Sequence, residues 1–337
     1  MKSSSESLSL AIQPILDTFL NHAVALTGCH TYGIARASCE YDILVVSEEE
    51  KPDSSMRVSE RYCDISFMSR EEAMNPATPE LAVALASLVP LRDSSWTLST
   101  AASANKAMFA SNAERSAESR LSLALKGLGK ADEALGKNST VDADFWLTAA
   151  GYDFALASVY ASEVPPAPSH VLKQMKTISS TGEASFTEWS ASVGLEQSSR
   201  EACAKRLDGL LTVYDIISSS GADARSNRLI EARRTEHAAK IVHAKAGNLI
   251  DSLQSVDCFA YLGYEAVLTL FSLLELQSIK ESVEPEYGAI LSVLTKGRLG
   301  IISEEVIKEL GWRREEKTLT RAADLLRQAI SDQAKRI

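Results

Sequence analysis

The hydrophobic pattern of the 337-residue chain changes near residue 100. Before that point, short apolar runs alternate with polar turns, which is typical of strands and short helices. After it, apolar residues recur at helical spacing over long stretches, which is typical of amphipathic helices. The sequence therefore predicts an α+β chain in which a small mixed sheet, within residues 1–99, precedes a large all-α region.

The N-terminal part is expected to hold one long helix and several strands. Residues 7–27 place apolar side chains at helical spacing, and Gly28 is typical of a helix end. Strands are predicted at HTYGI (30–34), EYDILVVS (40–47) and RYCDISFM (61–68). The last two are close enough in the chain that we expect them to pair as a hairpin with a long loop.

Two helix starts and the later helices follow from local signals. Ser69 and Glu72 have the spacing of a capping box, and Thr78 precedes Pro79 as at a helix N-terminus. VPLRDSSWTLS (89–99) is expected to be a short strand or an extended segment. Further helices are expected at 114–135, 142–163, 170–176 (with Ser169 as its cap), 195–218, 226–255, 258–282, 301–310 and 314–336.

The helical part is divided by a serine- and glycine-rich stretch at 218–226, which is typical of a linker. The predicted domains are therefore residues 1–99, a helical bundle of residues 100–218 and a C-terminal helical region of residues 219–337. The most apolar run, at 258–276, contains Glu265, so we expect a buried helix of the bundle and no membrane partner.

Charge and cysteine content narrow the classes of function. The net charge of −10 argues against extended binding of duplex nucleic acid, because such binding neutralises phosphates with Lys and Arg. Five scattered cysteines without a CxxC pair argue against a zinc site and favour a reducing compartment. The first 22 residues lack the apolar core of a signal peptide. We therefore expect a soluble, cytoplasmic protein.

Three acidic residues stand in or beside two of the predicted strands. Because side chains alternate along a strand, Glu40 and Asp42 share one face of the first strand. Asp64 lies in the second strand, and a register that sets it beside the pair would bring three carboxylates together. A divalent cation removes the resulting repulsion, and Mg²⁺ prefers such oxygen ligands. A solvated strand end is the alternative explanation of the pair alone.

YGIARASCEYDILVV followed by RYCDISFM resembles the nucleotidyltransferase superfamily, which includes the minimal and the aminoglycoside nucleotidyltransferases. That pattern has an apolar residue, a Gly-Ser pair, a short loop, two acids one residue apart and a third acid on a later strand. The resemblance covers about the first 100 residues and matches the family's glycine to Gly33. The helical remainder more loosely resembles the bundle that is appended to such domains.

The resemblance implies a Mg²⁺-dependent transfer of an NMP group from an NTP to a hydroxyl or similar acceptor. It implies that Glu40 and Asp42 hold the metals, two ions in all, and that Asp64 completes the site as catalytic base. Gly33, Arg36 and Ser38 are the candidate nucleotide-binding residues. A small molecule, an RNA end and a protein are all open as acceptors.

The chain departs from the family pattern at Ile34, where the family has a serine, and in the short loop between Gly33 and Glu40. Two further hypotheses therefore stand beside the enzyme. One is an inactive nucleotidyltransferase fold that binds a nucleotide or a protein partner. The other is a set of strands that merely caps a helical scaffold.

A basic helix, EARRTEHAAKIVHAKAG (231–247), carries His237 and His243. It is typical of a solvated face, and a grip on a phosphate or an RNA acceptor is the functional alternative.

Overall fold

The structure is a computed structural model that describes residues 12–49, 51–180, 182, 185–220, 228–281, 289–296 and 301–337. The chain divides into two compact units. The first contains Met1–Ala113 and Thr235–Ile241, and the second contains Glu114–Arg234 and Val242–Ile337. Compactness alone does not define independently folding domains, so the predicted boundaries after residues 99 and 218 stay predictions.

The first unit is built on a five-stranded sheet with the order β3-β4-β2-β1-β5. Strands β2 and β4 are parallel, and the other neighbouring pairs are antiparallel. The predicted α+β class with a small mixed sheet is confirmed. The strands are β1 (Ala23–Thr27), β2 (Tyr41–Val46), β3 (Ser54–Val58), β4 (Arg61–Met68) and β5 (Val89–Arg92).

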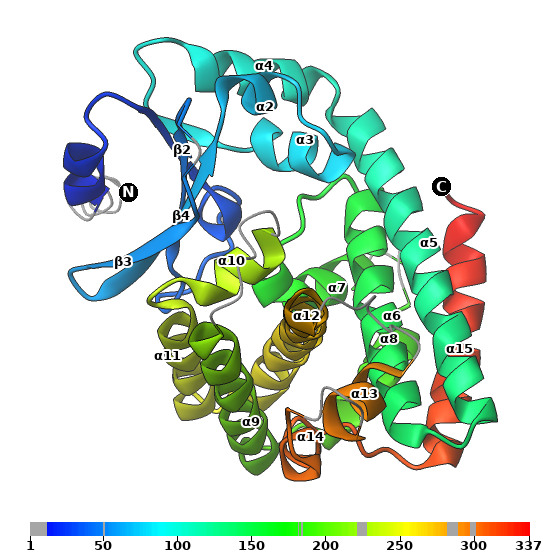
Figure 1. The fold of residues 1–337 in the computed structure, drawn as a ribbon. Coiled ribbons are helices and arrows are strands. Elements are labelled where there is room, and N and C mark those ends of the chain that lie inside the picture. Colours follow the sequence, from blue (N-terminus) through cyan, green and yellow to red (C-terminus); the bar gives the residue numbers. More distant parts are fainter. Residues whose placement is uncertain are drawn as a thin grey trace. The chain divides into compact units, whose positions relative to one another are not determined.

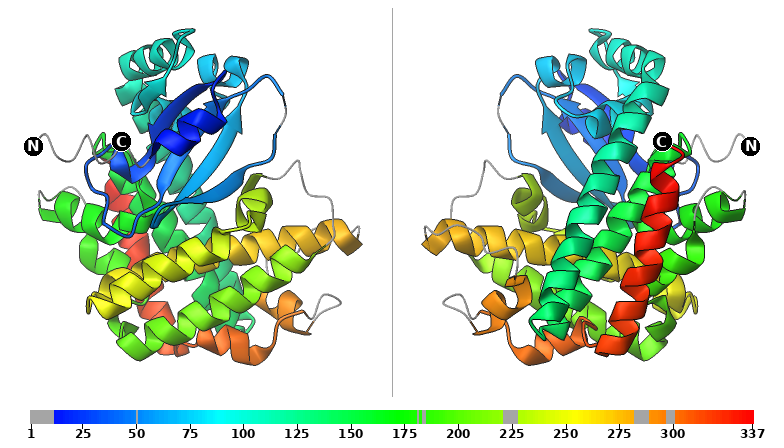
Figure 2. Two further views of the ribbon diagram at one scale, coloured as in Figure 1. Left: turned by 90° about the vertical axis from the view of Figure 1, so that its left-hand side faces the viewer. Right: turned by 90° about the vertical axis from the view of Figure 1, so that its right-hand side faces the viewer.

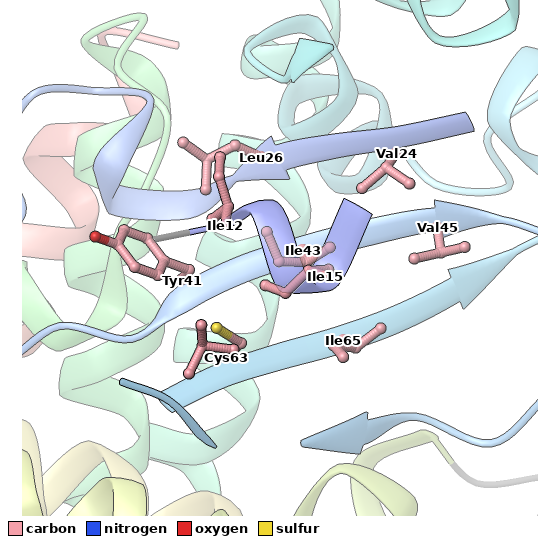
Figure 3. Close-up of a cluster of buried hydrophobic side chains, with 10 residues drawn as sticks. Ile12, Ile15, Val24, Leu26, Tyr41, Ile43, Val45, Cys63 and Ile65 are labelled. Carbon is pink, nitrogen blue, oxygen red and sulfur yellow. The ribbon is translucent and has the colours of Figure 1, made fainter. Parts of the chain in front are cut away.

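Both faces of the sheet carry apolar side chains, because β1, β2 and β4 are central strands. Figure 1 shows β3 beside β4 at one edge of the sheet. On one face, Ile12 and Ile15 of the N-terminal helix pack against a cluster that includes Ile43 and Ile65 (Figure 3). The opposite face packs against residues from three helices. These helices are α2 (Arg70–Met74), α3 (Pro79–Ala86) and α4 (Thr97–Ala107).

The predicted helix over residues 7–27 is wrong in its second half. Residues 12–18 are helical, but Ala23–Thr27 form β1 and pair with β2. Val24 and Leu26 face one side of the sheet and Ala25 faces the other. Because apolar residues lie on both faces, the periodicity of this short run does not distinguish a strand from a helix. Residues 7–11 lie outside the described residues.

The predicted hairpin of residues 40–47 and 61–68 is also wrong. These segments are β2 and β4, which run parallel, because β3 intervenes in the chain and pairs antiparallel with β4 at the edge of the sheet. The sequence of β3, SSMRV, is too short and polar to stand out from the turn before it. HTYGI is not a strand either, since Gly28–His30 form a 3₁₀ turn and residues 31–33 continue as a turn.

The local helix starts are confirmed. Ser69 and Glu72 form a capping box at α2, with both reciprocal hydrogen bonds present. The Thr78 side chain accepts a hydrogen bond from the Leu81 backbone N–H at the start of α3, where Pro79 occupies the first turn. Strand β5 confirms the first part of the extended segment expected at 89–99, but residues 97–99 already belong to helix α4.

The second unit is helical, and its helices α5 and α15 lie side by side (Figure 2). The expected helix over 226–255 is interrupted by a break between α10 and α11, and α8 and α13 were not expected. Residues 226–227 lie outside the described residues. From α5 onward the helices are α5 (Phe109–Gly136), α6 (Thr140–Ala161), α7 (Val171–Ser180), α8 (Phe186–Ser192), α9 (Arg200–Ser219), α10 (Arg228–Arg234), α11 (Ala238–Asp251), α12 (Ser255–Glu281), α13 (Ile290–Lys296), α14 (Glu304–Glu309) and α15 (Glu316–Ala334).

The apolar run at 258–276 lies within α12, which is long and apolar enough to cross a membrane by length and composition alone. In the structure, 72% of its most apolar window is buried, and α12 packs against α9. This burial is as expected for the core helix of a bundle.

A buried ion pair fixes the start of α15. The carboxylate of Asp144 on α6 contacts the Arg314 guanidinium at 2.6 Å, and the two side chains are 1% and 3% exposed. The same guanidinium donates hydrogen bonds to the backbone carbonyls of Ala191 and Ser192 at the end of α8. The Arg314 side chain therefore links α6, the end of α8 and the start of α15.

We predict that Asp144→Ala lowers the free energy of unfolding by about 3–5 kcal/mol, because it leaves the buried Arg314 charge uncompensated. The matched control is Asp132→Ala, which removes a pair with Arg327 whose side chains are both 47% exposed. That loss should be at most about 1 kcal/mol. Urea unfolding measures both, and equal losses would contradict this account.

Candidate metal centre

Three carboxylates converge on one face of the sheet. In the parallel register of β2 and β4, Asp42 lies directly opposite Asp64, and Glu40 precedes Asp42 by two residues on the same face. One oxygen atom from each of the three carboxylates lies within 4.8 Å of the others. Glu40 is buried and the two aspartates are half-buried. The expected convergence of Glu40, Asp42 and Asp64 is confirmed.

The acids stand where this sheet face changes from apolar to polar. Toward the ends of β2 and β4, Leu44 and Met68 belong to the cluster that packs against α2–α4. Toward their starts, a row of polar residues crosses four strands. We call it the polar row, and it consists of Thr27, Asp42, Asp64 and Ser55, each opposite the next in register.

Because Gly28 has no side chain, the Asp42 carboxylate can occupy the space beside it. It directly follows β1, with a φ of +69°. A Cβ atom at this position would lie 2.0 Å from Asp42 Oδ2, a separation that two such atoms do not tolerate. From its sequence context Gly28 was expected to end a helix, and its role beside Asp42 was not predicted. A glycine immediately after a strand-length apolar run was the signal that pointed to it.

The candidate nucleotide-binding residues lie in the connection between Gly28 and Glu40. Gly33 has a φ of +71° in an exposed turn, and a Cβ atom there would meet nothing within 4 Å. The Arg36 backbone N–H donates to Cys39 Sγ at 3.2 Å, which closes a tight turn around Ser38. This turn leads the chain into Glu40. That Gly33, Arg36 and Ser38 contact a nucleotide stays a prediction.

The negative charge of the acids affects neighbouring side chains. Burial, together with the carboxylates of Asp64, Asp42 and Glu40, raises the pKa of the Cys63 thiol to about 12. Tyr32 also has a raised pKa, mainly through burial and further through Asp42. Burial is the main cause of both shifts, and the carboxylates add to them as nearby negative charges that favour a cation at the starts of β2 and β4.

The donor set fits a hard divalent cation. All three groups are carboxylates, which are the ligands that Mg²⁺ and Mn²⁺ prefer. Their mutual repulsion falls when a cation binds, and the lack of a side chain at Gly28 makes room for the Asp42 carboxylate. Glu40, Asp42 and Asp64 would therefore hold the metal.

No protein-family model matches this chain, and no curated protein matches it closely enough to count as a relative. The nature of the site therefore has to be argued from its own geometry.

We predict that Gly28→Ala weakens Mn²⁺ binding about 10- to 100-fold, because the new methyl group must displace the Asp42 carboxylate. Gly33→Ala is the matched control. Its φ is also positive, so both variants lose roughly 1–2 kcal/mol of stability through the backbone. Only Gly28→Ala adds a clash with the carboxylate. Electron paramagnetic resonance of free Mn²⁺ measures the affinity, and unchanged binding by Gly28→Ala would contradict the assigned ligand role of Asp42.

Proposed function

We propose that this protein is a Mg²⁺-dependent nucleotidyltransferase, which moves an NMP group from an NTP to a hydroxyl or similar acceptor. The observation that carries this proposal is the convergence of Glu40, Asp42 and Asp64 within 4.8 Å of one another. Two Mg²⁺ ions held by such a set would neutralise the charge of the triphosphate and of the leaving pyrophosphate.

The three acids have two roles in this proposal, which are metal binding and general-base catalysis. Asp42 on β2 and Glu40, which directly precedes this strand, would hold the metals. Asp64, opposite Asp42 on the neighbouring strand, completes the ligand set and accepts the proton of the attacking hydroxyl as general base. Partial burial of the carboxylates limits access of bulk water and strengthens their interaction with a cation.

Gly28 fits the family resemblance better than Gly33. It directly follows a strand and contacts the Asp42 carboxylate, as a glycine beside the metal ligands should. Cys29 then takes the place of the family's serine, and the loop to Glu40 is longer and includes Gly33 as a second glycine. Arg36 and Ser38 remain the candidates for contacts to the triphosphate.

We also propose a cytoplasmic protein. The five cysteines are scattered along the chain without a CxxC pair, which favours a reducing compartment. The acceptor is a small molecule, an RNA end or a protein, and the acidic net charge of −10 disfavours an extended nucleic-acid duplex.

We predict that NTP and Mg²⁺ together raise the melting temperature of the protein and that this rise disappears in Asp42→Asn and Asp64→Asn. Each substitution removes a charged metal ligand and retains the shape of the side chain. Glu60→Gln, an exposed acid in the same unit, is the matched control and should respond as the wild type does. Loss of the response in all three variants would contradict a specific metal site.

Turnover is tested with two differently labelled NTPs and a panel of hydroxyl-bearing acceptors. A label at the α-phosphate should move to the acceptor, whereas a label at the γ-phosphate should appear in pyrophosphate. Transfer of the γ-label to the acceptor would contradict nucleotidyl transfer in favour of a kinase. Metal-dependent NTP binding without any transfer would favour the alternative, an inactive protein that only binds the nucleotide. The sequence supports this alternative in one respect, because neither Gly28 nor Gly33 is followed by the family's serine: the next residues are Cys29 and Ile34.

A further inference from the structure

A serine–histidine pair extends the polar row at the edge of the sheet. Ser55 on β3 lies opposite Asp64 in the antiparallel register, so both side chains are on the same face. His237 belongs to the segment Thr235–Ile241, which forms part of the same compact unit. Its backbone N–H donates a hydrogen bond of 2.9 Å to Ser55 Oγ.

The imidazole of His237 is placed to accept the Ser55 proton. His237 Nδ1 lies 3.4 Å from Ser55 Oγ. The ring packs against Tyr62 at a centroid distance of 5.4 Å, and the side chain is only 14% exposed. On the other side of the ring, Glu236 Oε1 lies 3.8 Å from Nε2.

Ser55 therefore stands between a carboxylate and an imidazole. A hydroxyl with a base in hydrogen-bond reach is the arrangement of an activated nucleophile, and these distances are often longer before the substrate binds. The backbone N–H of His237 would also stabilise negative charge that develops on Ser55 Oγ. Ser54, the next residue along β3, lies opposite Ile65 and so faces the apolar side of the sheet.

We propose that Ser55 is a site of self-nucleotidylation, an inference that rests on the proposed function. Ser55 Oγ attacks the α-phosphorus of a nucleoside triphosphate bound at the three carboxylates. A bond forms between Oγ and this phosphorus, and the bond from the phosphorus to the bridging oxygen of the β-phosphate breaks. Pyrophosphate leaves with that oxygen, and the hydroxyl proton of Ser55 passes to His237 Nδ1. The product is a phosphodiester between Ser55 and the NMP group.

The experiment incubates the full chain with an NTP and Mg²⁺ in the absence of any added acceptor. Intact mass spectrometry should detect the addition of one NMP group, and peptide sequencing should place it on Ser55. Ser55→Ala should abolish the addition, whereas Ser54→Ala should leave it unchanged. His237→Ala should slow it by about 100-fold, as expected for loss of a general base, and added imidazole should restore part of the rate.

Ser55→Thr is the control for the possibility that Ser55→Ala loses the modification because it misfolds. Threonine keeps the hydroxyl and has a high propensity for strands. This variant should still carry the NMP group at position 55. Melting temperatures in the absence of nucleotide should be close to that of the wild type for every variant that is compared.

Several results would overturn the inference or one of its parts. Modification at a residue other than Ser55, or equal modification of Ser55→Ala, would overturn it directly. An unmodified wild type that still shows the metal-dependent melting shift, or transfers the α-label to an external acceptor, would overturn the inference and retain the proposed function. If the wild type shows neither shift nor transfer, both fail. If the His237→Ala rate equals that of the wild type, His237 serves only to anchor Ser55, and its assigned role as base is wrong.

Discussion

The mutual repulsion of three carboxylates at one place on a sheet is the constraint on which the rest of the site depends. Two unit charges about 4 Å apart interact by about 4 kcal/mol near a protein surface. The register of β2 and β4 fixes Asp42 and Asp64 opposite each other, and Glu40 lies beside them. The rest of this unit tolerates the arrangement because the strands are secured by apolar packing on both faces, one of which is drawn in Figure 3. A bound cation turns the repulsion into a source of affinity.

Alternation within a strand predicted the face on which each acid lies, whereas the register that brings the acids together was assumed, and the structure supplied it. The face on which Asp42 or Asp64 lies depends only on its position within its own strand, so the wrong hairpin did not affect that part of the prediction. The direction of β4 could not be predicted, because it depends on β3, a five-residue edge strand with a weak sequence signal. The helix–strand error over residues 23–27 has a similar cause, since buried central strands lack polar alternation.

Contacts between distant parts of the chain were beyond sequence reasoning. The role of Gly28 depends on the pairing of β1 with β2, which the sequence analysis did not anticipate. His237 and Ser55 are 182 residues apart, and no local pattern links them. The basic composition around His237 drew attention to the helix predicted there, but not to the serine that His237 contacts from the break between α10 and α11.

The most direct test of the central claim is a crystal structure of the protein soaked with Mn²⁺, with data collected at the manganese absorption edge. An anomalous peak bounded by oxygen atoms of Glu40, Asp42 and Asp64, at about 2.0–2.2 Å from its ligands, is the predicted result. A fully occupied manganese position elsewhere, with none between these carboxylates, would contradict the account.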